Sequence, residues 1–157
     1  GDDDTIDAGL GDDTILFDVW DTTGVDGVDG IDTVRVYYHN ESIYIHTSSP
    51  AAQNANLSNM EIIDLRWGED NDLFLDAAAV AAATDSDNTL TVLGHATGAG
   101  HQNNVELETT DGWSHVNSGG PSVVSPDYAL AVFNHYTNAS GYHLYIHEDV
   151  TVGFTAL

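Results

Sequence analysis

Aspartate and glycine recur at a fixed spacing near the start of the chain, and these residue types suit metal binding. Asp4-Thr5-Ile6 returns nine residues later as Asp13-Thr14-Ile15, and Asp32-Thr33-Val34 repeats the same order. Carboxylates and backbone carbonyls are the hard oxygens that Ca²⁺ takes in sets of six to eight. Glycine permits turns in which a Cβ would clash, so that successive carbonyls can face one cation. The pattern therefore predicts calcium sites in residues 1–34.

The period of nine matches the calcium β-roll signature G-G-x-G-x-D-x-U-x, in which the aliphatic residue after the aspartate enters a thin core. Each nonapeptide is half a turn of such a roll, so Asp13 and Asp32, 19 residues apart, should stack on one side. The predicted calcium ligands are Asp4, Gly9, Gly11, Asp12, Asp13, Gly27, Asp29, Gly30 and Asp32, and the weaker candidates are Asp70, Asp72, Asp85 and Asp87. Solvent-facing turns are the alternative for the first set, and Asx turns that cap strands are the alternative for the second.

The charge balance also favours bound cations. The 157 residues carry 26 acidic side chains against two arginines and no lysine, a formal net charge of -24. Eleven of the 20 aspartates lie in residues 1–34, which favours specific cation sites over a general acidic coat. Nucleic acid and anionic lipid are poor partners for such a chain, and we expect neither nucleic-acid binding nor membrane insertion. Cysteine is absent, so bound metal ions, in place of disulfides, would stabilise the fold.

Short apolar runs predict an all-β fold with one helix. Strands are expected at 34–38, 42–46, 62–65, 73–75, 90–92 and 105–107, and later at 113–116, 128–136, 142–147 and 150–154. The first two strands form either a hairpin or two successive strands. The alanine-rich segment Ala77–Ala83 predicts a short helix with Asp76 as N-cap. The intervals from Asn71 to Asn88 and from Asn88 to Asn104, 17 and 16 residues, suggest full turns of a degraded solenoid.

The chain resembles the C-terminal regions of repeats-in-toxin (RTX) proteins exported by type I secretion, especially giant surface adhesins. The nonapeptides carry one part of the resemblance. The other part is an order of segments: Leu57–Leu65, Asp70–Leu75, Ala77–Ala83, Asp85–Gly94, Gly112-Trp113 and Leu144–Val150. The chain departs from the pattern in having only about three nonapeptides and in Asp2, which replaces a glycine.

The resemblance implies a secreted protein at the surface of a Gram-negative bacterium, unfolded during export by the type I machinery and folded outside by calcium. We expect a parallel β-roll at 1–34, a degenerate β-solenoid with a hairpin and a short helix at 35–110, and a β-rich cap at 111–157 with a possible secretion signal. Gly1 falls in mid-repeat and the only methionine is Met60, so we expect a fragment of a longer protein.

The expected function is a non-catalytic calcium-dependent folding module of an adhesin. One alternative is a subunit of a calcium-stabilised filament or surface layer, which would associate with itself or with neighbouring domains. Another is the non-catalytic RTX tail of a secreted protease or lipase. No G-x-S-x-G or H-E-x-x-H motif is present, so we predict no enzyme. His143 and His147 share one face of a strand, and with His135 they could hold a transition metal; their spacing along the strand favours surface histidines instead.

Overall fold

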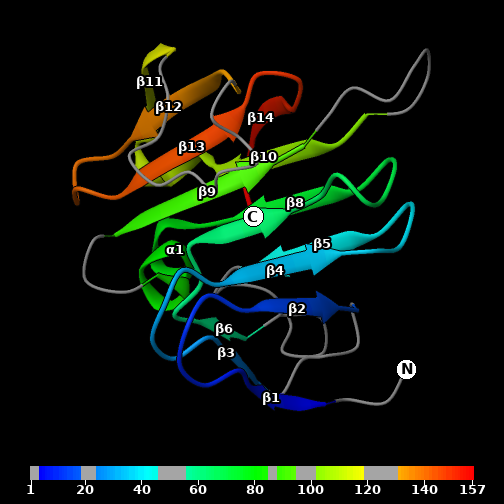
Figure 1. The fold of residues 1–157 in the computed structure, drawn as a ribbon. Coiled ribbons are helices and arrows are strands. Elements are labelled where there is room, and N and C mark those ends of the chain that lie inside the picture. Colours follow the sequence, from blue (N-terminus) through cyan, green and yellow to red (C-terminus); the bar gives the residue numbers. More distant parts are fainter. Residues whose placement is uncertain (1–3, 19–23, 46–55, 85–87, 95–101, 119–130) are drawn as a thin grey trace.

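The computed structural model describes residues 4–18, 24–45, 56–84, 88–94, 102–118 and 131–157. Over these residues the protein is mostly β with one short α-helix, as predicted (Figure 1). The strands are β1 (Thr5–Asp7), β2 (Thr14–Phe17), β3 (Gly24–Asp26), β4 (Thr33–Val36), β5 (Ser42–Ile45), β6 (Leu57–Ser58), β7 (Ile62–Asp64), β8 (Asp72–Leu75), β9 (Thr89–Leu93), β10 (Asn104–Glu108), β11 (Ser114–Ser118), β12 (Phe133–Thr137), β13 (His143–His147) and β14 (Thr151–Thr155). The helix α1 spans Ala77–Ala83, and a 3₁₀ turn, η1, spans Thr109–Asp111.

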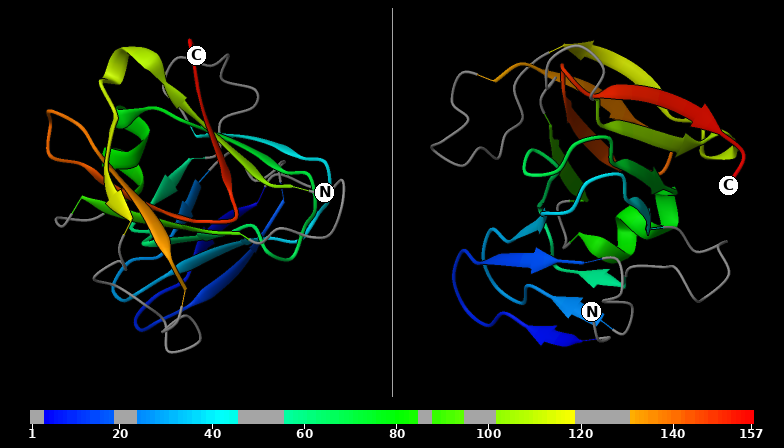
Figure 2. Two further views of the ribbon diagram at one scale, coloured as in Figure 1. Left: turned by 90° about the horizontal axis from the view of Figure 1, so that it is seen from above. Right: turned by 90° about the vertical axis from the view of Figure 1, so that its right-hand side faces the viewer.

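Three sheets divide the strands between them. The small sheet has the order β1-β3-β6, the four-stranded sheet β14-β10-β8-β5, and the seven-stranded sheet β11-β12-β13-β9-β7-β4-β2. Every pair is parallel except β11–β12 and β12–β13, so the seven-stranded sheet is mixed. The strands rise from β1 at one end of the molecule to β11–β14 at the other (Figures 1 and 2).

The chain runs through these sheets repeatedly, and we call each circuit a pass. Each new strand pairs with the strand of the previous pass in the same sheet. Thr14 pairs with Thr33, and Thr33 pairs with Ile62. Because β4 and β5 belong to different sheets, they are two successive strands, and the predicted hairpin is wrong. The last third does not form a sheet of its own either, since β13 joins β9 and β14 joins β10, both in parallel.

Helix α1 begins where the sequence predicts. The Asp76 side chain accepts a hydrogen bond from the Ala79 N–H at 2.6 Å, which satisfies one of the free donors of the first turn. Val80 and Ala83 are fully buried, and the Met60 N–H donates to the Ala83 carbonyl at the end of the helix. The helix packs beside β6, at the last strand of the small sheet.

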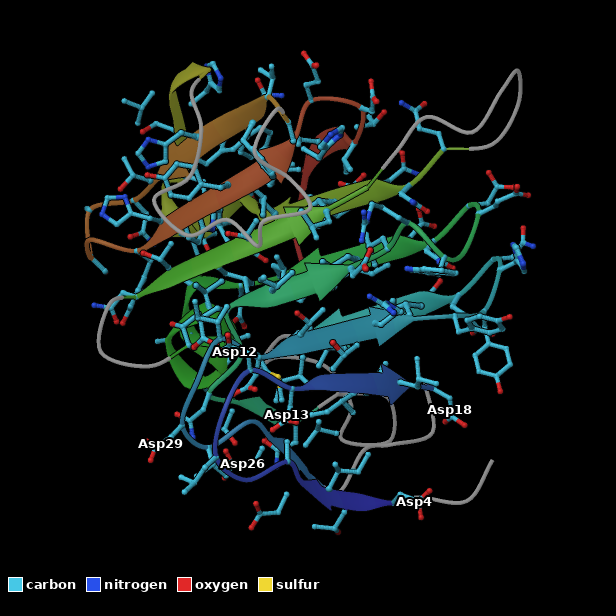
Figure 3. The ribbon with its side chains drawn as sticks, in the orientation of Figure 1. Asp4, Asp12, Asp13, Asp18, Asp26 and Asp29 are labelled. Atoms are coloured by element: carbon cyan, nitrogen blue, oxygen red, sulfur yellow. The ribbon has the colours of Figure 1, made fainter. Side chains whose placement is uncertain are left out.

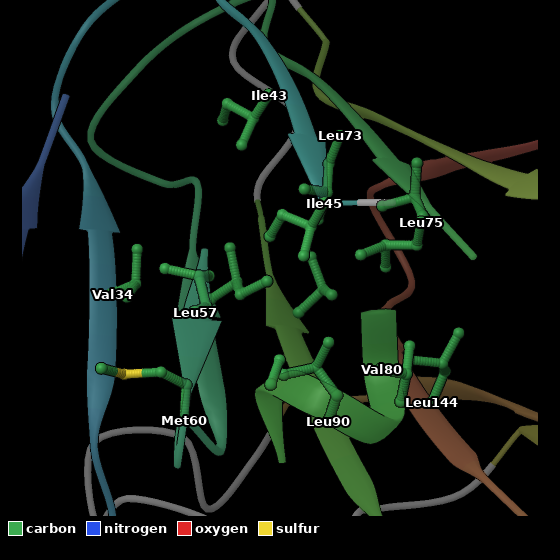
Figure 4. Packing of buried hydrophobic residues seen from close by; sticks show 14 of the residues in the cluster. Val34, Ile43, Ile45, Leu57, Met60, Leu73, Leu75, Val80, Leu90 and Leu144 are labelled. Atoms are coloured by element: carbon green, nitrogen blue, oxygen red, sulfur yellow. The ribbon is translucent and has the colours of Figure 1, made fainter. Parts of the chain in front are cut away.

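The core lies between the sheets and is built from alternating residues. In β4, β5 and β8 every second side chain is buried, which is the period expected of a strand with one face on a core. Figure 4 shows Ile43, Leu73, Val80 and Leu144 as members of this cluster, although they come from four different elements. No helix in the described part of the chain is long and apolar enough to cross a bilayer.

Two buried asparagines hold consecutive passes together. Asn71 accepts from the Glu41 N–H at 2.9 Å and donates to the Tyr38 carbonyl at 3.0 Å. Asn103 accepts from the Asn71 N–H and donates to the Leu65 carbonyl. The two asparagines stand 32 residues apart, so one pass takes about twice the 16–17 residues predicted from the Asn71–Asn88–Asn104 spacing. Asn88 lies on another side of the molecule, where its carbonyl accepts from the His143 N–H.

Candidate metal centre

The turns that precede β2 and β4 lie one upon the other, and they contain most of the predicted calcium ligands. Leu10 and Asp29 form a parallel bridge, the Gly11 N–H donates to the Asp29 carbonyl at 2.7 Å, and the Asp29 N–H donates to the Gly9 carbonyl at 3.3 Å. A Cβ on Gly30 would collide with the Gly11 carbonyl. The glycines therefore permit the close stacking of the two turns, as the nonapeptide pattern requires.

Gly9 and Gly11 have φ values of 98° and 106°, in the region that disfavours side chains. Val28 occupies the place that corresponds to Gly9 in the next turn, and its φ is 75°. A β-branched residue in this region is strained. The second turn thus keeps the backbone of a glycine repeat although the glycine itself is missing.

Asp13 and Asp32 stack on one side, as predicted. The Asp13 N–H donates to Asp32 Oδ1 at 2.8 Å, and the Asp32 N–H donates to Glu61 Oε2 at 2.8 Å. Asp13, Asp32 and Glu61 thus form a carboxylate ladder across three consecutive passes, before β2, β4 and β7. The Asp12 carboxylate accepts from the Ile31 N–H at 2.9 Å and lies at the same end of the strands. Figure 3 shows Asp12, Asp13, Asp26 and Asp29 gathered around these turns.

Asp32 is the most unusual residue of this group. Its side chain is buried, with 1% of the residue exposed, and its Oδ2 atom has no hydrogen-bond partner. Burial raises the pKa of the Asp32 carboxyl, and the negative charges of Asp13, Asp12 and Asp26 raise it further, against the lowering effect of the Asp13 N–H. A buried carboxylate oxygen without a donor is costly, because it has lost its water and gained nothing.

The space beside this oxygen is framed by other oxygens. A Cβ on Gly27 would overlap the Asn59 carbonyl oxygen and would lie 2.5 Å from Asp32 Oδ2. Asp26 accepts from Asn59 Nδ2 at 2.7 Å, so its carboxylate lies next to the same loop. Gly27 therefore permits the close approach of the Asn59 carbonyl and the Asp32 carboxylate, and oxygens of these two types are the donors that a hard cation such as calcium prefers.

The chain's own cations do not neutralise this region. Its two basic residues, Arg35 and Arg66, both bind Asp64, whose side chain is fully buried, at 3.2 and 2.7 Å. Arg35 also lies over the Trp67 ring. Both arginines of the chain are therefore engaged at Asp64.

Other predicted ligands lie elsewhere. Asp4 lies at the far end of β1 from the gathered aspartates (Figure 3). Asp70 Oδ1 accepts from the Gln102 N–H, and Asp72 Oδ1 accepts from Asn104 Nδ2, so both carboxylates tie one pass to the next. Asp85 and Asp87 lie outside the described residues.

Sequence reasoning missed Asp26, Asn59 and Glu61. Asp26 directly precedes the glycine of the third nonapeptide, and this position was a usable signal. Asn59 and Glu61 lie about 30 residues further on, outside any nonapeptide, and only the register of the sheets brings them back. Within the described part of the chain, no three His, Cys, Asp or Glu side chains converge on one metal position.

Searches of protein-family models, curated proteins and solved structures return no match to this chain.

Proposed function

We propose that this chain is a non-catalytic calcium-dependent folding module of a secreted surface protein, and that its parallel passes form a β-solenoid. The observation that carries the proposal is the Asp32 carboxylate, buried, partnerless at Oδ2, and surrounded by like charges. A cation bound beside Oδ2 would replace the missing hydrogen bond and reverse the local repulsion. The ligands would be the Asp32 carboxylate and one neighbouring carboxylate, that of Asp13 or Asp26, together with carbonyls of the glycine turns and of Asn59.

The proposed mechanism is ion-gated folding. At the low calcium of the cytosol, the acidic turns repel each other and the chain remains unfolded and competent for export by a type I system. Extracellular calcium modules have dissociation constants on the order of 10⁻⁴–10⁻³ M. Binding confined to the folded state stabilises that state, by about 2.7 kcal/mol per site at a calcium concentration 100 times the dissociation constant.

A calcium titration tests this function. The chain would be followed by far-ultraviolet circular dichroism and by hydrodynamic radius, from excess chelator to 10 mM calcium. We expect a large gain of β signal and a fall in radius across the titration. A chain that is folded in chelator and unchanged by calcium would show that the module does not depend on the ion.

A further inference from the structure

A second cluster of metal-ligand side chains lies far along the chain from the acidic turns, on the antiparallel strands β12 and β13. His135 Nε2 and His143 Nδ1 face each other at 2.9 Å. In the register of these strands His135 is opposite Tyr145 and Thr137 is opposite His143, so the two histidines are diagonal neighbours on one face. The spacing along β13 that argues against a site of His143 with His147 does not apply to this pair across strands.

The two rings are held in place by their surroundings. The His135 ring stacks on the Tyr145 ring, with centroids 4.5 Å apart and an interplanar angle of 9°. The His143 ring also stacks on His135, with centroids 5.2 Å apart and an interplanar angle of 30°. Both residues are half-buried. Fixed rings lose little freedom when they bind a ligand, which favours affinity.

We propose that His135 and His143 form a site for a transition-metal ion of the zinc class, separate from the calcium turns. Two imidazole nitrogens on one tetrahedral zinc ion lie roughly 3.3 Å apart, given Zn–N bonds of about 2.0–2.1 Å. The observed 2.9 Å separation is a hydrogen bond, so zinc binding requires a small opening of the pair and transfer of the shared proton to the other nitrogen of the ring that carries it. Imidazole nitrogen suits zinc, copper and nickel and does not suit calcium, so the two sites select different ions. Two water molecules would complete the tetrahedral coordination sphere, one more than in an open zinc site with three protein ligands.

The other nearby histidines are engaged differently. His147 packs edge-on against Phe133 and its Nδ1 accepts from the Asp149 N–H. His115 packs against Tyr136 at 5.2 Å. The site therefore consists of the His135–His143 pair.

Zinc titration by calorimetry tests the proposal, with calcium at saturation so that the acidic oxygens are occupied and the fold is the same in all samples. His135→Gln and His143→Gln are compared with His39→Gln, which removes an exposed histidine from the loop between β4 and β5. We expect wild type and His39→Gln to bind the first equivalent of zinc more tightly than later equivalents. His135→Gln and His143→Gln should each lose this tightly bound equivalent. Identical isotherms for all four proteins would overturn the site.

A second measurement uses the unaltered chain and does not depend on the folding of a variant. Long-range ¹H–¹⁵N spectra resolve the ring nitrogens of each histidine. On addition of one zinc equivalent, the His135 Nε2 and His143 Nδ1 resonances should move together. Movement of other histidines with these two unchanged would equally overturn the proposal. Neither experiment depends on whether calcium drives folding.

Discussion

The two carboxylate oxygens of Asp32 have different environments, and this difference makes the residue a sensitive probe of calcium binding. Oδ1 accepts from the Asp13 N–H, whereas Oδ2 is buried without a donor. In Asp32→Asn the first contact can persist, and the charge that repels Asp12, Asp13 and Asp26 is removed. We expect the calcium-free variant to be more stable than calcium-free wild type by about 1–3 kcal/mol, because it no longer buries a charge, and a buried charge without a partner costs at least that much.

The same variant should gain much less stability from calcium than wild type does. Urea unfolding at a series of calcium concentrations measures both effects, because the free energy of unfolding extrapolates to its calcium-free value and its slope gives the calcium response. Glu148→Gln is the matched control, because it removes one charge from an exposed residue at the other end of the molecule. A variant that is destabilised at the calcium-free extrapolation yet keeps the full calcium response would contradict the assignment of Asp32.

The raised pKa of Asp32 predicts a pH dependence with a definite sign. Its folded-state pKa lies above the unfolded value, so the folded state binds the proton more tightly. Stability from this group therefore rises as pH falls from neutral through the folded pKa, and the full effect is reached below the unfolded value near 3.9. Extrapolated to zero calcium, the stability difference between wild type and Asp32→Asn should shrink as the pH is lowered. A difference that is constant between pH 7 and pH 4 would contradict this.

Val28 is a local departure from the repeat that can be repaired. It holds a φ of 75° where the preceding turn has Gly9. Strain of this kind costs on the order of 1–3 kcal/mol. Glycine would remove the strain, but its greater conformational freedom in the unfolded state would offset part of the gain. Val28→Gly should raise the free energy of unfolding by about 1 kcal/mol, measured in urea at saturating calcium. Ile31→Gly is a suitable control, because Ile31 is also exposed but has no positive φ; it should not stabilise.

At the scale of elements, Asn71 and Asn103 join consecutive passes just before β8 and β10. The carboxylate ladder joins consecutive passes in the same way before β2, β4 and β7. Asn71 is fully buried, and its side chain bonds the Glu41 N–H and the Tyr38 carbonyl. Asn71→Ala leaves both backbone groups without these partners. We expect a loss of about 2–4 kcal/mol, since each unsatisfied buried group costs about 1–3 kcal/mol. The half-buried Asn134 on β12 provides the control, and Asn134→Ala should cost much less in the same unfolding experiment.

Local signals in the sequence predicted some elements well. The N-cap Asp76 and the alanine run define α1 to the residue, because capping and helix propensity act within a few positions. The nonapeptide period also predicted that Asp13 and Asp32 would stack, and they do. Both results depend on patterns that are complete within a short stretch of chain.

Other elements could not be predicted in this way. β3 and β6 are three and two residues long and bury one apolar side chain each, Val25 and Leu57. Such strands have no period to detect, and they exist because neighbouring passes supply their hydrogen bonds. For the same reason Asn59 and Glu61 could not be assigned to the acidic turns, since sheet register alone brings them there.

At the scale of the whole molecule, the charge of -24 allows two explanations for any dependence on ions. General screening of self-repulsion needs only ionic strength, and its range shrinks to a Debye length of about 10 Å at 0.1 M salt. A specific site needs an ion of the right size and oxygen preference. The fixed partners of Asp32, and the engagement of both arginines at Asp64, favour the specific explanation.

Matched salts separate the two explanations. We expect 10 mM CaCl₂ to fold the chain, whereas NaCl at the same ionic strength, about 30 mM, should leave it largely unfolded. MgCl₂ at 10 mM should also be ineffective, because Mg²⁺ demands near-ideal octahedral geometry and gives up its water reluctantly. Circular dichroism at a fixed protein concentration gives the folded fraction in each salt. If the three salts folded the chain equally, or if molar NaCl alone did so, diffuse screening would account for the stability and the ligand role of Asp32 would lose its support.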